Sequence, residues 1–123
     1  MTTDKTGAAV TVTHEPDVQR FEIAVADTAS EPAPAGFTAY RDRADGDSRQ
    51  RVFFHTEVAE EFGGRGLGTI LIRHALDQTR AEGIVIVGVC PMVAAYLGKH
   101  PEYADAARKP TPDILRWLDA ELS

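Results

Sequence analysis

The spacing of hydrophobic and polar residues changes along the chain, and this change separates predicted strands from predicted helices. Hydrophobic residues alternate with polar ones in Val18–Val25 and, most regularly, in Gln50–Val58. Successive side chains of a strand point to opposite faces, so this period is typical of a half-buried strand. In the second segment the alternation predicts two faces, with Val52, Phe54, Thr56 and Val58 on one, and Phe53, His55 and Glu57 on the other.

Apolar residues recur at helical spacing in Gly66–Glu82, which predicts an amphipathic helix that Gly83 is placed to end. The continuous apolar run Ile84–Val89 is typical of a strand covered on both faces. A strand, a helix and a strand in this order predict a right-handed crossover. The other predicted elements are a strand at Gly36–Arg43, ended by the turn Ala44–Ser48, and two helices that begin at Pro91 and Pro112.

Two stretches carry no such periodicity. Asp27–Gly36 holds two prolines and a glycine, and we expect it to be a loop. Met1–Ala9 is made of small and polar residues, and we expect it to be frayed and remote from function.

Composition limits the classes of function. With 123 residues, of which 43% are hydrophobic, the chain is expected to fold as a single domain over residues 1–123. A formal charge of −6 opposes binding to nucleic acid, because that affinity depends on neutralising phosphates. The chain has neither an apolar run of bilayer length nor a signal-peptide core, so we expect no membrane association and a cytoplasmic location. Four scattered histidines and one cysteine show no metal-site spacing, and no metal is expected.

The most informative stretch joins a predicted strand to a predicted helix and reads GGRGLGT, from Gly63 to Thr69. A helix N-terminus carries roughly half a positive charge and unpaired N–H groups, and glycines let an anion approach them. A phosphate is therefore the expected ligand. The stretch lacks the Lys-Ser/Thr pair of a P-loop, and Thr69 stands where a dinucleotide fingerprint requires glycine. A third form, R/Q-x-x-G-x-G/A, is met at Gly66 and Gly68.

That form resembles the pyrophosphate loop of the GNAT acetyltransferase superfamily. The motifs FFHTEV, GGRGLG, ALDQTRAEG, VCPMVAAY and HPEY resemble, in order and spacing, the small single-domain GNAT-like proteins of the YjdJ type. The resemblance implies an α/β fold with a mixed, largely antiparallel sheet flanked by helices. It also implies that Gln50–Val58 and Ile84–Val89 splay apart around acetyl-CoA. The residues implied to bind coenzyme A are Val58, Gly63, Gly64, Arg65, Gly66, Leu67, Gly68, Thr69, Cys90 and Tyr96.

One position departs from the superfamily pattern. Gly63 stands where Arg or Gln is usual, so one side-chain contact to phosphate is lost, and Arg65 either replaces it or does not.

Four residues are candidates for catalysis. Glu57 and His55 lie two positions apart on one strand, where a carboxylate beside an imidazole could relay a proton from an amine. The resemblance favours Glu57 as the general base. Cys90 precedes Pro91 as a candidate helix N-cap, and is either a nucleophile or a residue that lies beside the acyl group. Tyr96 matches, by resemblance, the tyrosine that protonates the departing thiolate.

The sequence thus predicts an N-acetyltransferase that moves an acetyl group from acetyl-CoA to an amine of a small molecule or a protein. The alternative is a non-catalytic acyl-CoA-binding or protein-interaction module. The predicted loop Asp27–Gly36 stands where the superfamily usually has one or two helices that wall the acceptor site. Either the acceptor is large and brings its own surface, or the protein has no dedicated acceptor.

Overall fold

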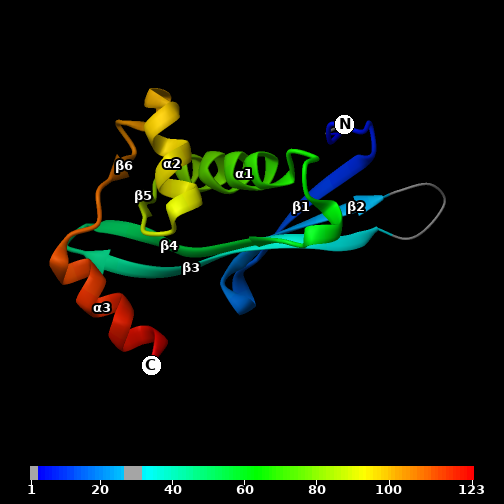
Figure 1. Cartoon of the computed structure of the whole chain (residues 1–123). Helices are drawn as coiled ribbons and strands as arrows, with labels where there is room; N and C mark the ends of the chain where they lie inside the picture. Colours follow the sequence, from blue (N-terminus) through cyan, green and yellow to red (C-terminus); the bar gives the residue numbers. More distant parts are fainter. Residues whose placement is uncertain (1–2, 27–31) are drawn as a thin grey trace.

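The computed structural model describes residues 3–26 and 32–123, and its central element is one six-stranded sheet (Figure 1). The strands are β1 (Ala9–Glu15), β2 (Arg20–Ala26), β3 (Ala33–Asp45), β4 (Ser48–Val58), β5 (Val85–Gly88) and β6 (Ala107–Arg108). They lie in the order in which they occur in the chain. The first four pair antiparallel, and β5 and β6 continue the sheet in parallel. The sheet is therefore mixed and mostly antiparallel, as predicted.

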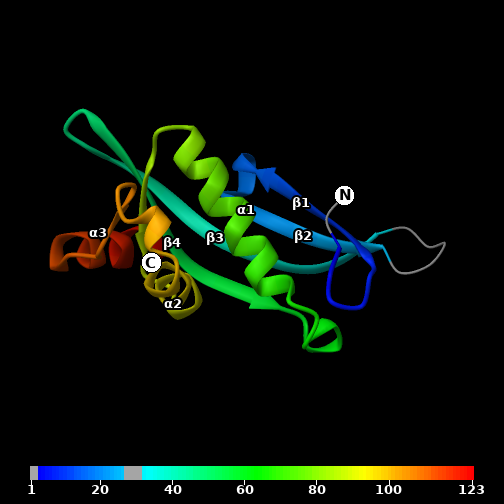
Figure 2. The same cartoon turned by 90° about the horizontal axis from the view of Figure 1, so that it is seen from above.

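Helices cover the two faces of this sheet unequally (Figures 1 and 2). They are α1 (Leu67–Ala81), α2 (Pro91–Lys99) and α3 (Pro112–Leu122). The larger core lies between α1, α2 and the sheet, and includes Phe21, Ile23, Val25, Tyr40, Phe53, Leu71, Leu76 and Ile86. A smaller core beneath α3 on the opposite face contains Val52, Val87, Ile114 and Leu118. The predicted helices and the predicted strand–helix–strand order are confirmed.

The N-terminal stretch differs from the expectation of a frayed end. Thr3 bridges to Ala9, and Asp4 is only 6% exposed, so the described part of this stretch is packed. β1 follows and was not predicted. Its alternating segment is short, with only Val10 and Val12 between threonines. Its strand conformation comes from pairing with β2 along its full length.

The predicted loop Asp27–Gly36 is corrected at its C-terminal end. Residues 27–31 lie outside the described part of the chain, but β3 begins at Ala33 and pairs with β2 despite Pro34. A register shift between Ile23 and Ala24 of β2 admits one additional β3 residue at this point. This irregularity makes room for a proline in the paired segment.

The two predicted faces of β4 are also corrected. Ala39 of β3 pairs with His55, whereas Tyr40 pairs with Phe53, so Phe54 is an additional residue that forms a β-bulge. Beyond the bulge the alternation is inverted. Phe53, Thr56 and Val58 face α1, while Val52, Phe54, His55 and Glu57 face the other side. Periodicity alone could not detect an inserted residue.

β4 and β5 separate just before this bulge. Their pairing covers Gln50–Phe53 and Val85–Gly88, and the Phe53 carbonyl then accepts from both Val89 N (3.0 Å) and Cys90 N (2.9 Å). From Phe54 onwards β4 pairs with β3 alone among the described strands. The two strands therefore splay at the place where the resemblance implied it.

Candidate active site

The glycine-rich turn forms the N-terminus of α1. Gly64 and Gly66 have positive φ values of 75° and 79°, a backbone region that residues with a Cβ rarely adopt. No side chain caps the helix, and its first bond runs from Ile70 N to the Gly66 carbonyl at 3.2 Å. The N–H groups of Leu67, Gly68 and Thr69 therefore point out of the helix end without an intrahelical acceptor. This end can accept an anion.

The first turn of α1 lies beside the end of β4 and the start of α2. A Cβ built on Gly68 would lie 3.7 Å from a methyl carbon of Val58 and 2.8 Å from Met92 Cε. Glycine thus permits the close approach of these three elements. The glycine turn and the open end of β4 consequently belong to one continuous region.

Arg65 is turned towards the N-terminal stretch. Its Nε donates to Asp4 Oδ2 at 2.6 Å, an Nη donates to Thr6 Oγ1 at 3.2 Å, and the guanidinium lies over the Phe62 ring. Hydrogen bonds from the Thr6 hydroxyl, and then from Arg65, lower the pKa of Asp4 to about 2, although burial opposes this shift. Arg65 therefore anchors the N-terminal stretch to the glycine turn.

A chain of three polar side chains lies on the α1 side of the splayed strands. Cys90 Sγ donates to Thr56 Oγ1 at 3.4 Å, and Thr56 Oγ1 is 2.9 Å from Thr38 Oγ1. Cys90 occupies the N-cap of α2, as predicted, and is 4% exposed. Because the alternation of faces is inverted beyond the β4 bulge, Thr56 lies beside this thiol. The sequence reasoning missed Thr38, since β3 brings it here by pairing.

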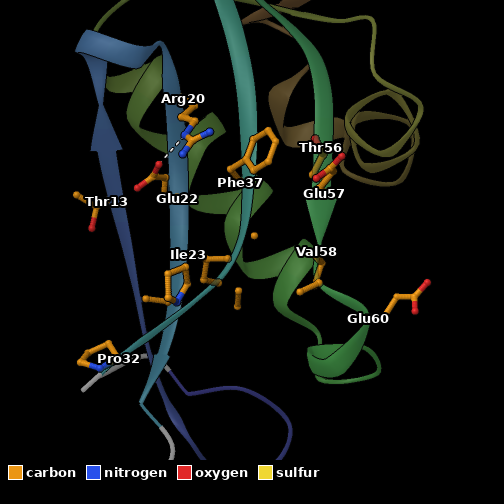
Figure 3. A pocket seen from close by; sticks show the side chains of 15 residues that line it. Thr13, Arg20, Glu22, Ile23, Pro32, Phe37, Thr56, Glu57, Val58 and Glu60 are labelled. Carbon is orange, nitrogen blue, oxygen red and sulfur yellow. Dashed lines mark hydrogen bonds and ion pairs between the residues drawn. The ribbon is translucent and has the colours of Figure 1, made fainter. Parts of the chain in front are cut away.

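Glu57 and His55 lie together on the opposite face, where His55 Nε2 is 2.9 Å from Glu57 Oε1. Both side chains are exposed, at 62% for Glu57 and 50% for His55. Glu57 borders a groove of about 810 Å³ on the face not covered by α1, and Figure 3 shows it with Phe37 of β3 and the Arg20–Glu22 pair of β2. A carboxylate here can receive a proton from an amine that enters the groove.

Tyr96 lies in an aromatic cluster on the inner side of α2. Its ring stacks on His100 with a centroid distance of 4.0 Å and is tilted against Tyr103 at 6.0 Å. Burial raises the pKa of the Tyr96 phenol, and Tyr103 donates a hydrogen bond to Asp77 of α1 beside it. Burial therefore favours the protonated phenol, the form that a proton donor needs, but also makes it a weaker acid. The structure thus places Tyr96 apart from the Glu57–His55 pair.

Apart from Tyr96, which lies in the aromatic cluster, the sequence-predicted residues therefore form three groups around the splayed strands. The glycine turn and Val58 form one, Cys90 with Thr56 forms the second, and Glu57 with His55 forms the third. Among the described residues no cluster of three or more His, Cys, Asp or Glu side chains could hold a metal ion. No described helix is both long and apolar enough to span a bilayer.

The sequence and the fold are both similar to those of known acetyltransferases. The model of the GCN5-related N-acetyl-transferase family matches residues 20–106. A GCN5-like protein from Staphylococcus aureus shares the fold with a TM-score of 0.55 and 20% identity, over 83% of this chain and 91% of that one. Ribosomal-protein-alanine N-acetyltransferase from Brucella melitensis biovar Abortus 2308 has a TM-score of 0.52 and 13% identity, over 85% and 93% of the two chains.

None of the curated proteins compared with the chain matches it. The family match nevertheless covers well over half of the sequence and includes the glycine turn, both splayed strands and Cys90. The two solved structures agree with it in fold. The chain belongs to the family of GCN5-related N-acetyltransferases, enzymes that transfer an acetyl group to an amine.

Proposed function

We propose that the acetyl donor is acetyl-CoA, bound between β4 and β5 with its pyrophosphate at the N-terminus of α1. The observation that carries this proposal is the uncapped end of α1 beside the splay that begins at Phe53. The glycine turn fits phosphate groups, because its exposed N–H groups can be approached closely. We also propose, from the motifs given above, that the protein is of the YjdJ type.

The donor would supply an activated thioester. The residues of the chain then need only to align the acceptor and move a proton. Glu57 would take the proton that the amine loses as its nitrogen bonds to the acetyl carbon and the carbon–sulfur bond breaks. The departing thiolate would receive a proton, for which Tyr96 is the candidate. His55, 2.9 Å from Glu57, would orient its carboxylate.

The position of Glu57 supports this role more strongly than its sequence spacing did. Its side chain lies on the groove side of β4, while the preceding residue Thr56, which also lines the groove, contacts Cys90 from the other face. An amine that enters from the groove would thus approach the splayed strands on the side of the base. The groove has no helix over it in the described chain, which suits a large acceptor that brings its own surface.

Glu57→Gln tests the proposal. Free thiol release from acetyl-CoA, measured with a panel of amines, peptides and lysate fractions, first identifies an acceptor. With that acceptor, Glu57→Gln should lower kcat by about 10²- to 10⁴-fold because the general base is lost. Its affinity for coenzyme A, measured by calorimetry, should stay unchanged because a general base acts on the acceptor amine and not on the proposed phosphate site.

Glu60→Gln is the matched control, since Glu60 lines the same groove and loses the same charge. It should turn over like the wild type. Equal activity of Glu57→Gln and Glu60→Gln across the pH range would instead assign the base to His55 or to water.

A further inference from the structure

The N-terminal stretch brings a lysine to the glycine turn. A Cβ built on Gly66 would lie 3.3 Å from Lys5 Cε, 3.5 Å from its Cγ and 3.7 Å from its Cδ. The aliphatic part of Lys5 therefore lies alongside the residue that caps α1. The ammonium is one bond of about 1.5 Å beyond Cε. It is thus held close to the helix end at which we place the phosphates.

The backbone on both sides of Lys5 is fixed. Lys5 N donates to the Arg65 carbonyl at 3.0 Å, inside the glycine turn. Asp4 Oδ1 accepts from Thr6 N at 2.8 Å and from Ala8 N at 3.1 Å, and Asp4 Oδ2 binds Arg65. The two neighbours of Lys5 are therefore both tied to Arg65, since Thr6 also accepts from its guanidinium. This arrangement positions Lys5 before any ligand binds.

Lys5 differs from the other charged residues near the glycine turn in its ion pairing. Glu60 and Glu61 precede the glycines, and the guanidinium of Arg65 is bound to Asp4. No ion pair joins Lys5 to another residue within 3–26 and 32–123, and its side chain is exposed. Gly63, moreover, provides no side chain at the position where the superfamily usually has Arg or Gln. The turn's own cation, Arg65, is thus engaged by Asp4, and Gly63 adds none.

We propose that Lys5 is a phosphate-binding residue of the acetyl-CoA site, and that its ammonium pairs with the pyrophosphate at the N-terminus of α1. This inference rests on the proposed donor. Lys5 lies outside the matched region 20–106, so the family assignment does not include it. A lysine binds phosphate as a flexible point charge, which suits a residue that reaches the site from a separate segment.

Calorimetric titration of Lys5→Ala with coenzyme A tests this role. An exposed charge pair with phosphate predicts a Kd increase of about five- to tenfold at low salt. The increase should shrink as ionic strength rises, because salt screens the pair. Lys5→Arg keeps the charge and should restore most of the affinity. The matched control is Lys99→Ala, which removes an exposed lysine at the end of α2 and should bind like the wild type.

Two further ligands locate the contact. Dephospho-coenzyme A keeps the pyrophosphate and lacks the 3′-phosphate, and Lys5→Ala should weaken its binding by the same factor. Pantetheine has no phosphate, and its binding should not respond to Lys5→Ala. A loss confined to coenzyme A, or a loss that extends to pantetheine, would refute a pyrophosphate contact.

The two proposals fail in different ways. A wild-type protein that binds no coenzyme A would refute the proposed donor. A wild-type protein that binds it, together with a Lys5→Ala variant that matches Lys99→Ala, would refute only the role of Lys5.

Discussion

Among single residues, Cys90 is the one whose chemistry depends most on its immediate neighbours. Its thiol donates to Thr56 Oγ1 at 3.4 Å and is almost fully buried. Buried structural cysteines are typically unreactive, whereas a covalent route through Cys90 requires a reactive thiolate. We therefore predict direct attack by the amine. Cys90→Ala should keep most of its turnover and lose about 1 kcal/mol of stability.

Mass spectrometry of the intact protein checks this prediction. After brief incubation with acetyl-CoA and no acceptor, the wild type should carry no added acetyl group. An acetyl on Cys90 that is absent from Cys90→Ser and passes to an added amine would establish the covalent route instead.

Between elements, Arg51 of β4 joins Asp42 of β3 to the C-terminal end of α1. Arg51 has a side-chain exposure of 3%, and its guanidinium donates to both oxygens of Asp42, at 2.8 and 3.0 Å. It also reaches Thr79 and Glu82 of the α1 end, each at 3.4 Å. Without the Asp42 carboxylate, the buried guanidinium keeps the more distant ion pair with Glu82, whose side chain is 41% exposed. Breaking a buried ion pair costs about 3–5 kcal/mol. Asp42→Asn should therefore lower the unfolding free energy by about 3 kcal/mol.

Urea denaturation measures that change. Asp119→Asn, an exposed substitution on α3, is the control and should be nearly neutral. The double variant Arg51→Met with Asp42→Leu should recover most of the loss, because no unpaired charge remains. If Asp42→Asn and Asp119→Asn were equally stable, the Arg51–Asp42 pair would not stabilise the fold.

Hydrophobic periodicity predicted most elements but missed features that depend on pairing. It found α1 and β4 because their apolar residues repeat within the element itself. It missed β1, which has few apolar residues and depends on β2. It also grouped Thr56 with Val52 and Phe54, which lie on the other face, because a bulge is defined by two strands together. The spacing of apolar residues within one segment indicates which of its residues are buried. It does not indicate the register in which that segment pairs with another.

For the molecule as a whole, the shifted pKa values of His14 and Asp4 predict how the stability of the fold depends on pH. Burial, and then the charge of Arg51, lower the pKa of His14 below 6.5 in the folded state, where its ring contacts Tyr40 and Gln78. The unfolded chain thus binds this proton more readily, and stability should fall as pH drops below about 6.5. Asp4 has a folded pKa of about 2 against 3.8, so its contribution is lost between about pH 4 and 2.

Urea midpoints measured from pH 8 to 2 should consequently fall in two stages. His14→Gln should flatten the first stage and leave the second, while Asp4→Asn should do the reverse. A curve with the same first stage in His14→Gln and in the wild type would show that another group titrates there.

The candidate site shows the same division between local and distant information. The glycine turn and the Glu57–His55 pair could be located because each lies within a few consecutive residues. The Asp4–Arg65 contact joins residues 61 positions apart, and no local pattern indicates it. The N-terminal stretch was therefore expected to be remote from function, although its packing brings Lys5 to the glycine turn.

The bulge at Phe54 divides β4 into two halves that can be altered independently. Gln50–Phe53 is buried and paired on both sides, so it tolerates little change. His55 and Glu57 lie beyond the bulge and are exposed on the groove side. Substitutions there leave the cores intact. A library confined to these two exposed positions should accordingly retain folded members far more often than one directed at Gln50–Phe53, even where catalysis is lost.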